Sequence, residues 1–160
     1  MLVSGLLIPL IAPRFLELII WAPFGGIFLT LGMARLQNQG SVAVMILPLA
    51  IVLALLSPLI GGYLALTAIL TEASLLFLRG NYRLQKNRYL GNIIFFLLAL
   101  VIGYGTAALV VGEEFAALLT QPWHVAGLIL AMAMTASVGW RLGEIMLSQL
   151  KRMGRWKTET

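Results

Sequence analysis

Between two long apolar segments the chain reads RGNYRLQKNR, residues 79–88. This stretch carries four positive charges, Arg79, Arg83, Lys86 and Arg88, in a sequence of which only 11% is charged. Cytoplasmic loops of inner-membrane proteins are enriched in Lys and Arg. The stretch therefore predicts a cytoplasmic loop between two membrane-spanning helices, and the orientation of the whole chain follows from it.

The composition on both sides of this loop is that of a membrane protein. Hydrophobic residues make up 61% of the 160 residues, and the mean hydropathy is +0.98. A soluble fold of this length cannot bury so much apolar surface. The net charge of +5 does not indicate a nucleic-acid partner, because the basic residues flank apolar segments. We expect a multi-pass, all-α integral membrane protein of the plasma membrane, surrounded by lipid.

Charges, prolines and glycines divide the chain into six apolar segments. A helix needs roughly 20 residues to cross the hydrocarbon core, and the first segment is shorter than that. It is either a half-helix, a tilted element or the remainder of a longer helix. We expect residues 1–150 to form one bundle of about six transmembrane helices, with a basic cytoplasmic tail at 151–160. The segments are 2–12, 15–34, 41–57, 59–78, 89–111 and 123–150.

Turn residues and charges then give the connections and the orientation. Ser57-Pro58, followed by two glycines, predicts a tight hairpin. With the 79–88 loop inside, the loop that contains Glu113 and Glu114 falls outside. Ten of the eleven Lys and Arg residues then lie on or near the cytoplasmic side, and Arg14 is the exception. Both termini face the cytoplasm if the first segment spans the membrane.

The sequence offers little for catalysis or for binding a metal. It contains no Cys, no Asp and a single His, and it has no nucleotide-binding or Ser/His/Asp pattern. Glu113 and Glu114 are a conceivable cation site, although a solvated acidic loop explains them as well. We expect neither an enzyme nor a bound cofactor or metal.

Small residues recur every four positions in the last segment and form one ridge, to which another helix can approach closely. The ridge serves either packing inside the bundle or docking of a partner protein's helix. Glu72 is the other unusual residue, because a bare carboxylate at membrane depth is costly. It is either compensated structurally or used as a coupling or proton site. The ridge consists of Gly127, Ala131, Thr135, Gly139 and Gly143.

Polar and aromatic residues converge on the predicted outer side. Trp and Tyr at this depth form either an interfacial belt or the walls of a small-molecule site. On the second interpretation they are substrate-binding residues. The candidates are Trp21, Tyr63, Thr67, Tyr104, Glu113, Glu114, Trp123 and His124.

Three stretches carry a family resemblance. The first is PFGGIF at 23–28 with Met33-Ala34-Arg35, and the second is Gly61-Gly62 with Thr71-Glu72 and LRGNYR at 78–83. The third runs from Thr135 to Gly143 and into the basic tail. In this order and spacing, over about residues 20–154, the chain resembles the substrate-binding S components of energy-coupling factor (ECF) transporters.

The resemblance implies a six-helix bundle that captures a vitamin or related micronutrient from outside. Such proteins work with a transmembrane coupling subunit and two cytoplasmic ATPases, and they topple in the membrane to release the substrate inward. The chain departs from the family at residues 2–9, LVSGLLIP, where the family's first helix commonly offers Ala-rich positions to the coupling subunit. The alternative function is a non-transporting accessory or assembly subunit of a larger membrane complex.

Overall fold

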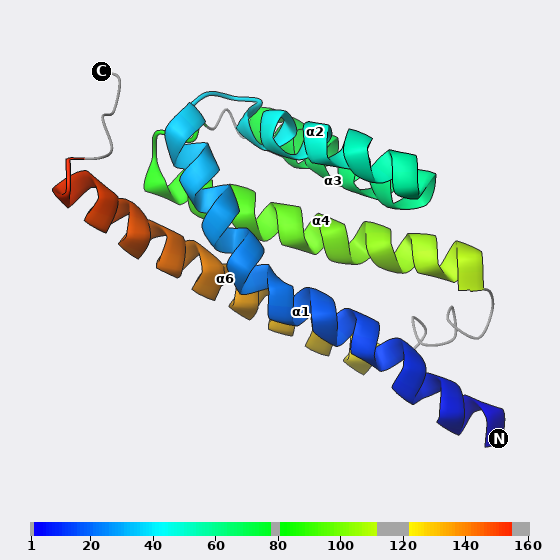
Figure 1. Ribbon diagram of the computed structural model, residues 1–160. Helices are drawn as coiled ribbons and strands as arrows, with labels where there is room; N and C mark the ends of the chain where they lie inside the picture. The colour runs from blue at the N-terminus through cyan, green and yellow to red at the C-terminus, as the bar shows by residue number, and fades with distance from the viewer. Residues whose placement is uncertain (1, 78–80, 112–121, 155–160) are drawn as a thin grey trace.

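The structure is a computed structural model that describes residues 2–77, 81–111 and 122–154. Side chains are described from residue 19 onward, except those of residues 107, 108, 110, 111, 122 and 124. In these residues all regular secondary structure is helical, which confirms the all-α expectation. The described helices are α1 (Leu2–Leu36), α2 (Ser41–Leu56), α3 (Pro58–Phe77), α4 (Gln85–Val111) and α6 (Pro122–Arg152) (Figure 1).

Helix α1 joins two segments that the sequence analysis separated. It is one continuous helix of 35 residues, which passes through Pro13 and Arg14 without a break. Proline is tolerated inside a transmembrane helix, because local adjustments and neighbouring groups satisfy the freed backbone carbonyls. The described residues thus form five helices and not six, and the short first segment is the beginning of α1. At 1.5 Å per residue this helix is about 52 Å long, well over the thickness of a hydrocarbon core.

The predicted hairpin at Ser57 and Pro58 is present between α2 and α3. Ser57 alone separates the two helices, in an extended conformation (φ −151°, ψ 107°), and its N–H donates to the Leu53 carbonyl oxygen at 2.8 Å. A Cβ at Gly61 would lie 2.5 Å from the Cβ of Ala54. Glycine at this position therefore lets α3 return directly along α2.

The helices form two pairs with α4 between them. In Figure 1, α2 and α3 lie together on one side of α4, and α1 crosses α6 on the other. Helices α1 and α6 run in the same direction, because Gly26 contacts Gly139 and Thr30 contacts Gly143 one turn further along both. The core lies where α4 meets α1, α3 and α6, and it is formed by residues such as Leu29, Met33, Leu75, Phe95, Phe96 and Met132.

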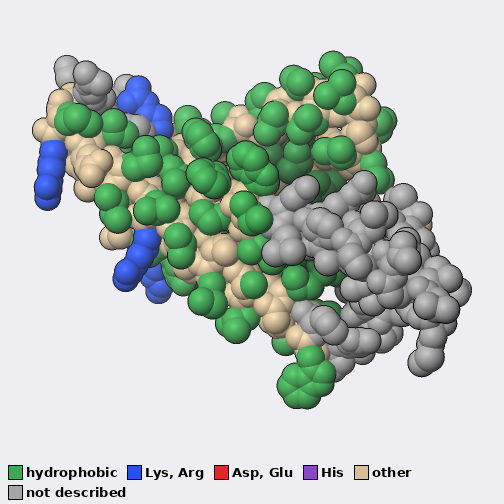
Figure 2. Space-filling view, turned by 60° about the horizontal axis from the view of Figure 1, so that its bottom comes forward, with side chains coloured by type: hydrophobic (Ala, Val, Ile, Leu, Met, Phe, Trp, Pro, Cys, Tyr) green, Lys and Arg blue, Asp and Glu red, His purple; other side chains and the backbone are tan. Residues whose placement is uncertain are grey.

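Four of the described helices are long and apolar enough to cross a membrane. The spans are Ile19–Leu36, Pro58–Phe77, Gln85–Thr106 and Val125–Arg152, whereas α2 is apolar but has only 16 residues. Figure 2 shows hydrophobic side chains over most of the described surface, with Lys and Arg gathered toward the end at which α6 finishes. A surface of this kind is suited to lipid, so the chain is a membrane protein.

Candidate functional site

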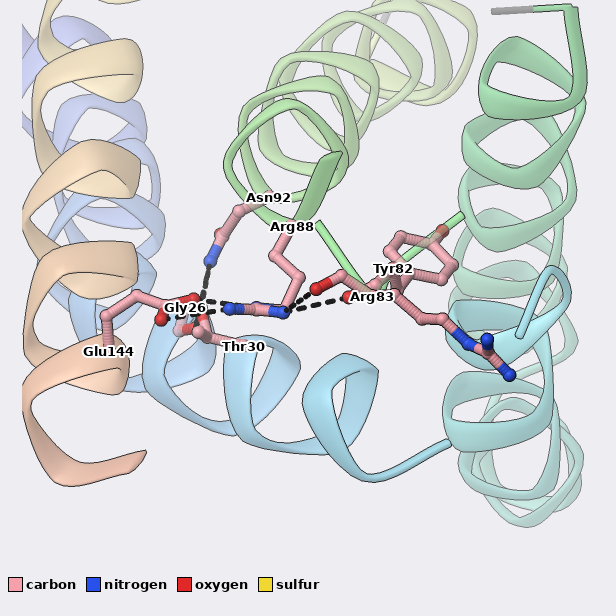
Figure 3. A network of polar contacts seen from close by, with 7 residues as sticks. All are labelled: Gly26, Thr30, Tyr82, Arg83, Arg88, Asn92 and Glu144. Carbon is pink, nitrogen blue, oxygen red and sulfur yellow. Dashed lines mark hydrogen bonds and ion pairs between the residues drawn. The ribbon is translucent and has the colours of Figure 1, made fainter. Parts of the chain in front are cut away.

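An ion pair that the sequence analysis did not predict lies between α4 and α6. Arg88 donates from Nε to Oε1 of Glu144 at 2.7 Å and from Nη2 to Oε2 at 3.0 Å (Figure 3). Both side chains are largely shielded, with exposed fractions of 9% and 16%. Two parallel charge-assisted hydrogen bonds fix the relative position of the two helices as well as neutralising both charges.

The same guanidinium holds the turn that precedes α4. Its Nη1 donates to the carbonyl oxygens of Tyr82 and Arg83, at 2.9 and 3.0 Å. Arg88 is therefore one of the four charges that predicted a cytoplasmic loop, but it is turned into the protein. Arg83 and Lys86, in contrast, are exposed.

One turn along α4, Asn92 binds α1. Its Nδ2 donates to the Gly26 carbonyl oxygen and to the Thr30 hydroxyl, both at 2.9 Å, and the Thr30 hydroxyl donates to Gly26 at 2.7 Å (Figure 3). Asn92 and Thr30 are fully buried. A buried amide that binds two acceptors contributes to helix association in lipid. The Oδ1 atom of Asn92 has no hydrogen-bond partner in the described part of the chain.

The carboxylate of Glu72 caps the beginning of α2. Its Oε2 accepts the Gly40 N–H at 2.9 Å, and its Oε1 accepts the Val42 N–H at 2.6 Å and the Tyr82 hydroxyl at 3.1 Å. A negative charge at a helix N-terminus is favoured by the free N–H groups and by the helix dipole. These three donors supply the compensation that a carboxylate with only 6% exposure requires.

Tyr82 connects the two acidic sites. Its hydroxyl donates to Glu72, while its carbonyl oxygen accepts from Arg88. Burial raises the pKa of Tyr82, and the neighbouring Glu72 carboxylate raises it further. The hydroxyl therefore stays protonated and remains a donor. We call the connected residues Glu72, Tyr82, Arg88 and Glu144 the polar network; they link α2, α3, α4 and α6.

A cavity of about 240 Å³ lies between α4 and α6, away from the polar network. Along α4, Leu100 is twelve residues from Arg88, which corresponds to about 18 Å. None of the described residues that line the cavity is charged, and Tyr104 carries the one polar side chain among them. The lining residues are Leu100, Val101, Tyr104, Gly105, Val125, Leu128 and Ile129.

Of the predicted substrate-binding residues, only Tyr104 lines this cavity within the described part of the chain. The Tyr63 hydroxyl instead donates to the Ala99 carbonyl oxygen at 3.1 Å, and the Thr67 hydroxyl donates to Tyr63 within α3. Tyr63 therefore joins α3 to α4, whereas the Thr67 hydroxyl is bound within its own helix.

Of the other candidates, the two that the structure describes with side chains, Trp21 and Trp123, do not line this cavity. Trp21 and Trp123 are exposed by 66% and 86%, as expected of a residue in an interfacial belt. Glu113, Glu114 and the side chain of His124 lie outside the described residues. The apolar lining of the cavity was missed because Leu, Val and Ile carry no distinguishing signal in a sequence that is apolar throughout.

The small-residue ridge of α6 divides into two parts. A Cβ at Gly139 would lie 2.6 Å from the Pro23 carbonyl oxygen, and one at Gly143 would lie 2.6 Å from the Cβ of Thr30. This end of the ridge packs against α1. At the other end, a Cβ at Gly127 would meet no atom of the described residues within 4 Å. Between them, Ala131 and Thr135 are half-buried, and the Thr135 hydroxyl donates to the Ala131 carbonyl oxygen.

Comparisons of this chain with protein-family models, with curated proteins and with solved structures found no match.

Proposed function

We propose that this protein is the substrate-capture subunit of an ATP-driven importer for a vitamin or related small micronutrient, of the kind seen in ECF transporters. The cavity between α4 and α6 carries the proposal, because a mostly apolar hollow with a single polar side chain, Tyr104, among its described lining is typical of small-molecule sites. On this proposal a transmembrane coupling subunit and two cytoplasmic ATPases supply the energy.

The positions of the cavity and the charges support capture from outside. The polar-network end of the helices carries Arg35, Lys86, Lys151 and Arg152, and Arg83 lies in the turn before α4 at the same end. The cavity lies toward the other end. If the basic end faces the cytoplasm, as positive charges favour, the cavity lies in the outer half of the membrane. The polar network then fastens the helices on the inner side, where the partner subunits would bind.

Ligand that stays bound through purification tests the proposal. We expect mass spectrometry of gently solubilised protein to reveal a co-purified small molecule. Adding that compound back should raise the free energy of unfolding by RT ln(1 + [L]/Kd), and the melting temperature should rise with it. The stabilisation should be smaller in Leu128→Trp, which fills the cavity, than in Leu76→Trp, which changes an exposed residue of α3. The proposal would be contradicted if the protein eluted only as part of a complex that lacks ATPases and if no small molecule co-purified with it.

An accessory or assembly subunit is the second candidate function, and α1 offers an observation in its favour. Ile20, Trp21, Phe24 and Phe28 are all more than half exposed and lie on one side of this helix. Such a face suits a partner helix as well as it suits lipid. Replacing Phe24 and Phe28 by Leu keeps the face apolar but removes both rings. Loss of a co-purifying membrane protein from this variant, with the ligand assays unchanged, would favour the accessory function.

A further inference from the structure

We infer that the cavity between α4 and α6 binds an uncharged, ring-sized apolar group, and so that the captured molecule presents a neutral ring to the protein. The inference rests on the proposed function and names the chemical class of its ligand. It makes no use of Glu113 and Glu114, the conceivable cation site of the sequence analysis, which lie outside the described residues.

The chemistry of the lining argues against a charged group. Six of the seven lining residues are aliphatic or glycine, and the seventh is Tyr104. A charged group placed among them would lose its water and gain no opposite charge from the described residues. An apolar group would instead exchange water or lipid for close contacts with these side chains.

The size of the cavity argues for one ring. An apolar cavity of about 150 Å³ in another protein accepts benzene, and the volume here is about 240 Å³. One aromatic or alicyclic ring with a small substituent therefore fits. The ring of Tyr104 forms one wall, and aromatic rings favour offset-stacked or edge-to-face contacts with a second ring.

Gly105 keeps part of this space open. A Cβ at Gly105 would meet no atom of the described residues within 4 Å, whereas one at Gly103, two residues earlier, would touch the ring of Tyr63 at 3.4 Å. Since Gly105 lines the cavity, a side chain added there can occupy the ligand's place without a clash at its Cβ. This makes Gly105 a position at which the cavity can be filled while the packing of the helices is kept.

The test uses the full chain in phosphatidylcholine nanodiscs and three probes of matched size: 4-fluorotoluene, 4-fluorobenzylammonium and 4-fluorobenzoate. Fluorine NMR linewidths report binding, and empty nanodiscs give the contribution of partitioning into lipid. We expect saturable binding of 4-fluorotoluene and binding of both charged probes that is at least about tenfold weaker. Gly105→Leu should weaken 4-fluorotoluene binding at least about tenfold, and Gly105→Ala should weaken it less.

Gly62→Leu is the matched control, because a Cβ at Gly62 also meets no atom within 4 Å but lies on α3, away from the cavity. It should bind the probe as the unmodified chain does. Charged probes that bind as tightly as the neutral one, or unchanged binding in Gly105→Leu with its helical content intact, would overturn the inference. Displacement of 4-fluorotoluene by oleate but not by toluene would also overturn it, since an acyl chain would then be the occupant.

The same series separates this inference from the proposed function. Suppose that the protein binds the probe and yet supports no ATP-dependent uptake when it is produced together with a coupling subunit and ATPases. That result would uphold the neutral site and overturn the transport function. If the protein instead takes up a charged compound, and Gly105→Leu does not change that uptake, the transport function is upheld and the neutral site is overturned.

Discussion

At the scale of single residues, four charged or polar groups are buried together and each has partners. Arg88 contacts both oxygens of Glu144 and two backbone carbonyl groups, so its charge is compensated in place. Removing the charge of either Arg88 or Glu144 leaves the other charge buried and unpaired. The resulting loss in the free energy of unfolding is larger than the net contribution of the intact pair. The effects of substitution in this network should therefore be strongly non-additive.

The pair of Arg88 and Glu144 allows a direct test of this coupling. Glu144→Gln should lower the free energy of unfolding by about 3 kcal/mol, because it leaves a buried guanidinium without a countercharge. The double variant Arg88→Met, Glu144→Met should cost less than the sum of its single substitutions. Unfolding in mixed micelles with increasing dodecyl sulfate measures the free energy of unfolding of the unmodified chain and of each variant. Additive effects would show that the two side chains do not interact energetically.

Glu72 should be equally sensitive, for a different reason. Glu72→Ala leaves the N–H groups of Gly40 and Val42 without their acceptor, and we expect a loss of at least about 2 kcal/mol. Tyr82→Phe removes a single hydrogen bond to the same carboxylate and should cost about 1 kcal/mol. The same unfolding titration compares them. An equal loss in the two variants would contradict the capping role of Glu72.

At the scale of helices, glycine decides which contacts are close. Gly26 and Gly139 bring the backbones of α1 and α6 together, in the manner of small-residue motifs in membranes. The two helices run in parallel, so the four-residue spacing of Gly139 and Gly143 matches that of Gly26 and Thr30. One end of the ridge is thereby used inside the protein, whereas Gly127 at its other end has no close neighbour among the described residues.

The two ends of the ridge should respond in opposite ways to the same substitution. Gly139→Ala forces a methyl group to within 2.6 Å of the Pro23 carbonyl oxygen, and we expect destabilisation by about 2 kcal/mol. Gly127→Ala meets no atom within 4 Å and should leave stability unchanged or raise it by up to about 1 kcal/mol, because alanine favours the helix. Melting temperatures in one detergent distinguish the two. Destabilisation by Gly127→Ala would indicate a contact at that end as well.

Individual elements show how far the sequence could predict the structure. The hairpin at Ser57 followed from local turn chemistry, and the helical class followed from hydropathy. The break between the first two segments was wrong, because Pro13 signals a helix end in water but not in lipid, where helix breaking is more costly. The partner of Glu72 could not be predicted, since it consists of backbone N–H groups 30 and 32 residues away. The lining of the cavity has no sequence signature either.

At the scale of the whole molecule, α4 lies between the pair of α2 and α3 and the pair of α1 and α6, and the two pairs also meet directly where α1 contacts α2. The polar network joins these pairs at one end, where Arg88 meets Glu144 (Figure 3). The cavity lies between α4 and α6 toward the other end. An arrangement fastened at one end allows the helices to separate more easily at the other. A ligand that enters from that side would not need to break a buried ion pair.

The orientation of this arrangement can be measured, because the chain contains no Cys. We expect Trp123→Cys to react with a membrane-impermeant maleimide in intact cells, and Lys151→Cys to react only after permeabilisation. Both residues are exposed, and they lie near opposite ends of α6. Labelling of Lys151→Cys in intact cells would reverse the orientation. A single crossing by α1 would place Leu2 on the same side as Trp123 and opposite Lys151, since α1 and α6 run in the same direction.

The cap that Glu72 provides for α2 also has a consequence for biosynthesis. Val42 leaves the ribosome 30 residues before Glu72, and Tyr82 follows ten residues later. At roughly 5 to 20 residues per second, α2 waits about 2 to 6 seconds with the first N–H groups of its backbone unsatisfied. Its 16 residues are too few to settle across a bilayer easily. Helices α2 and α3 should therefore enter the bilayer as one unit, after translation has passed residue 72.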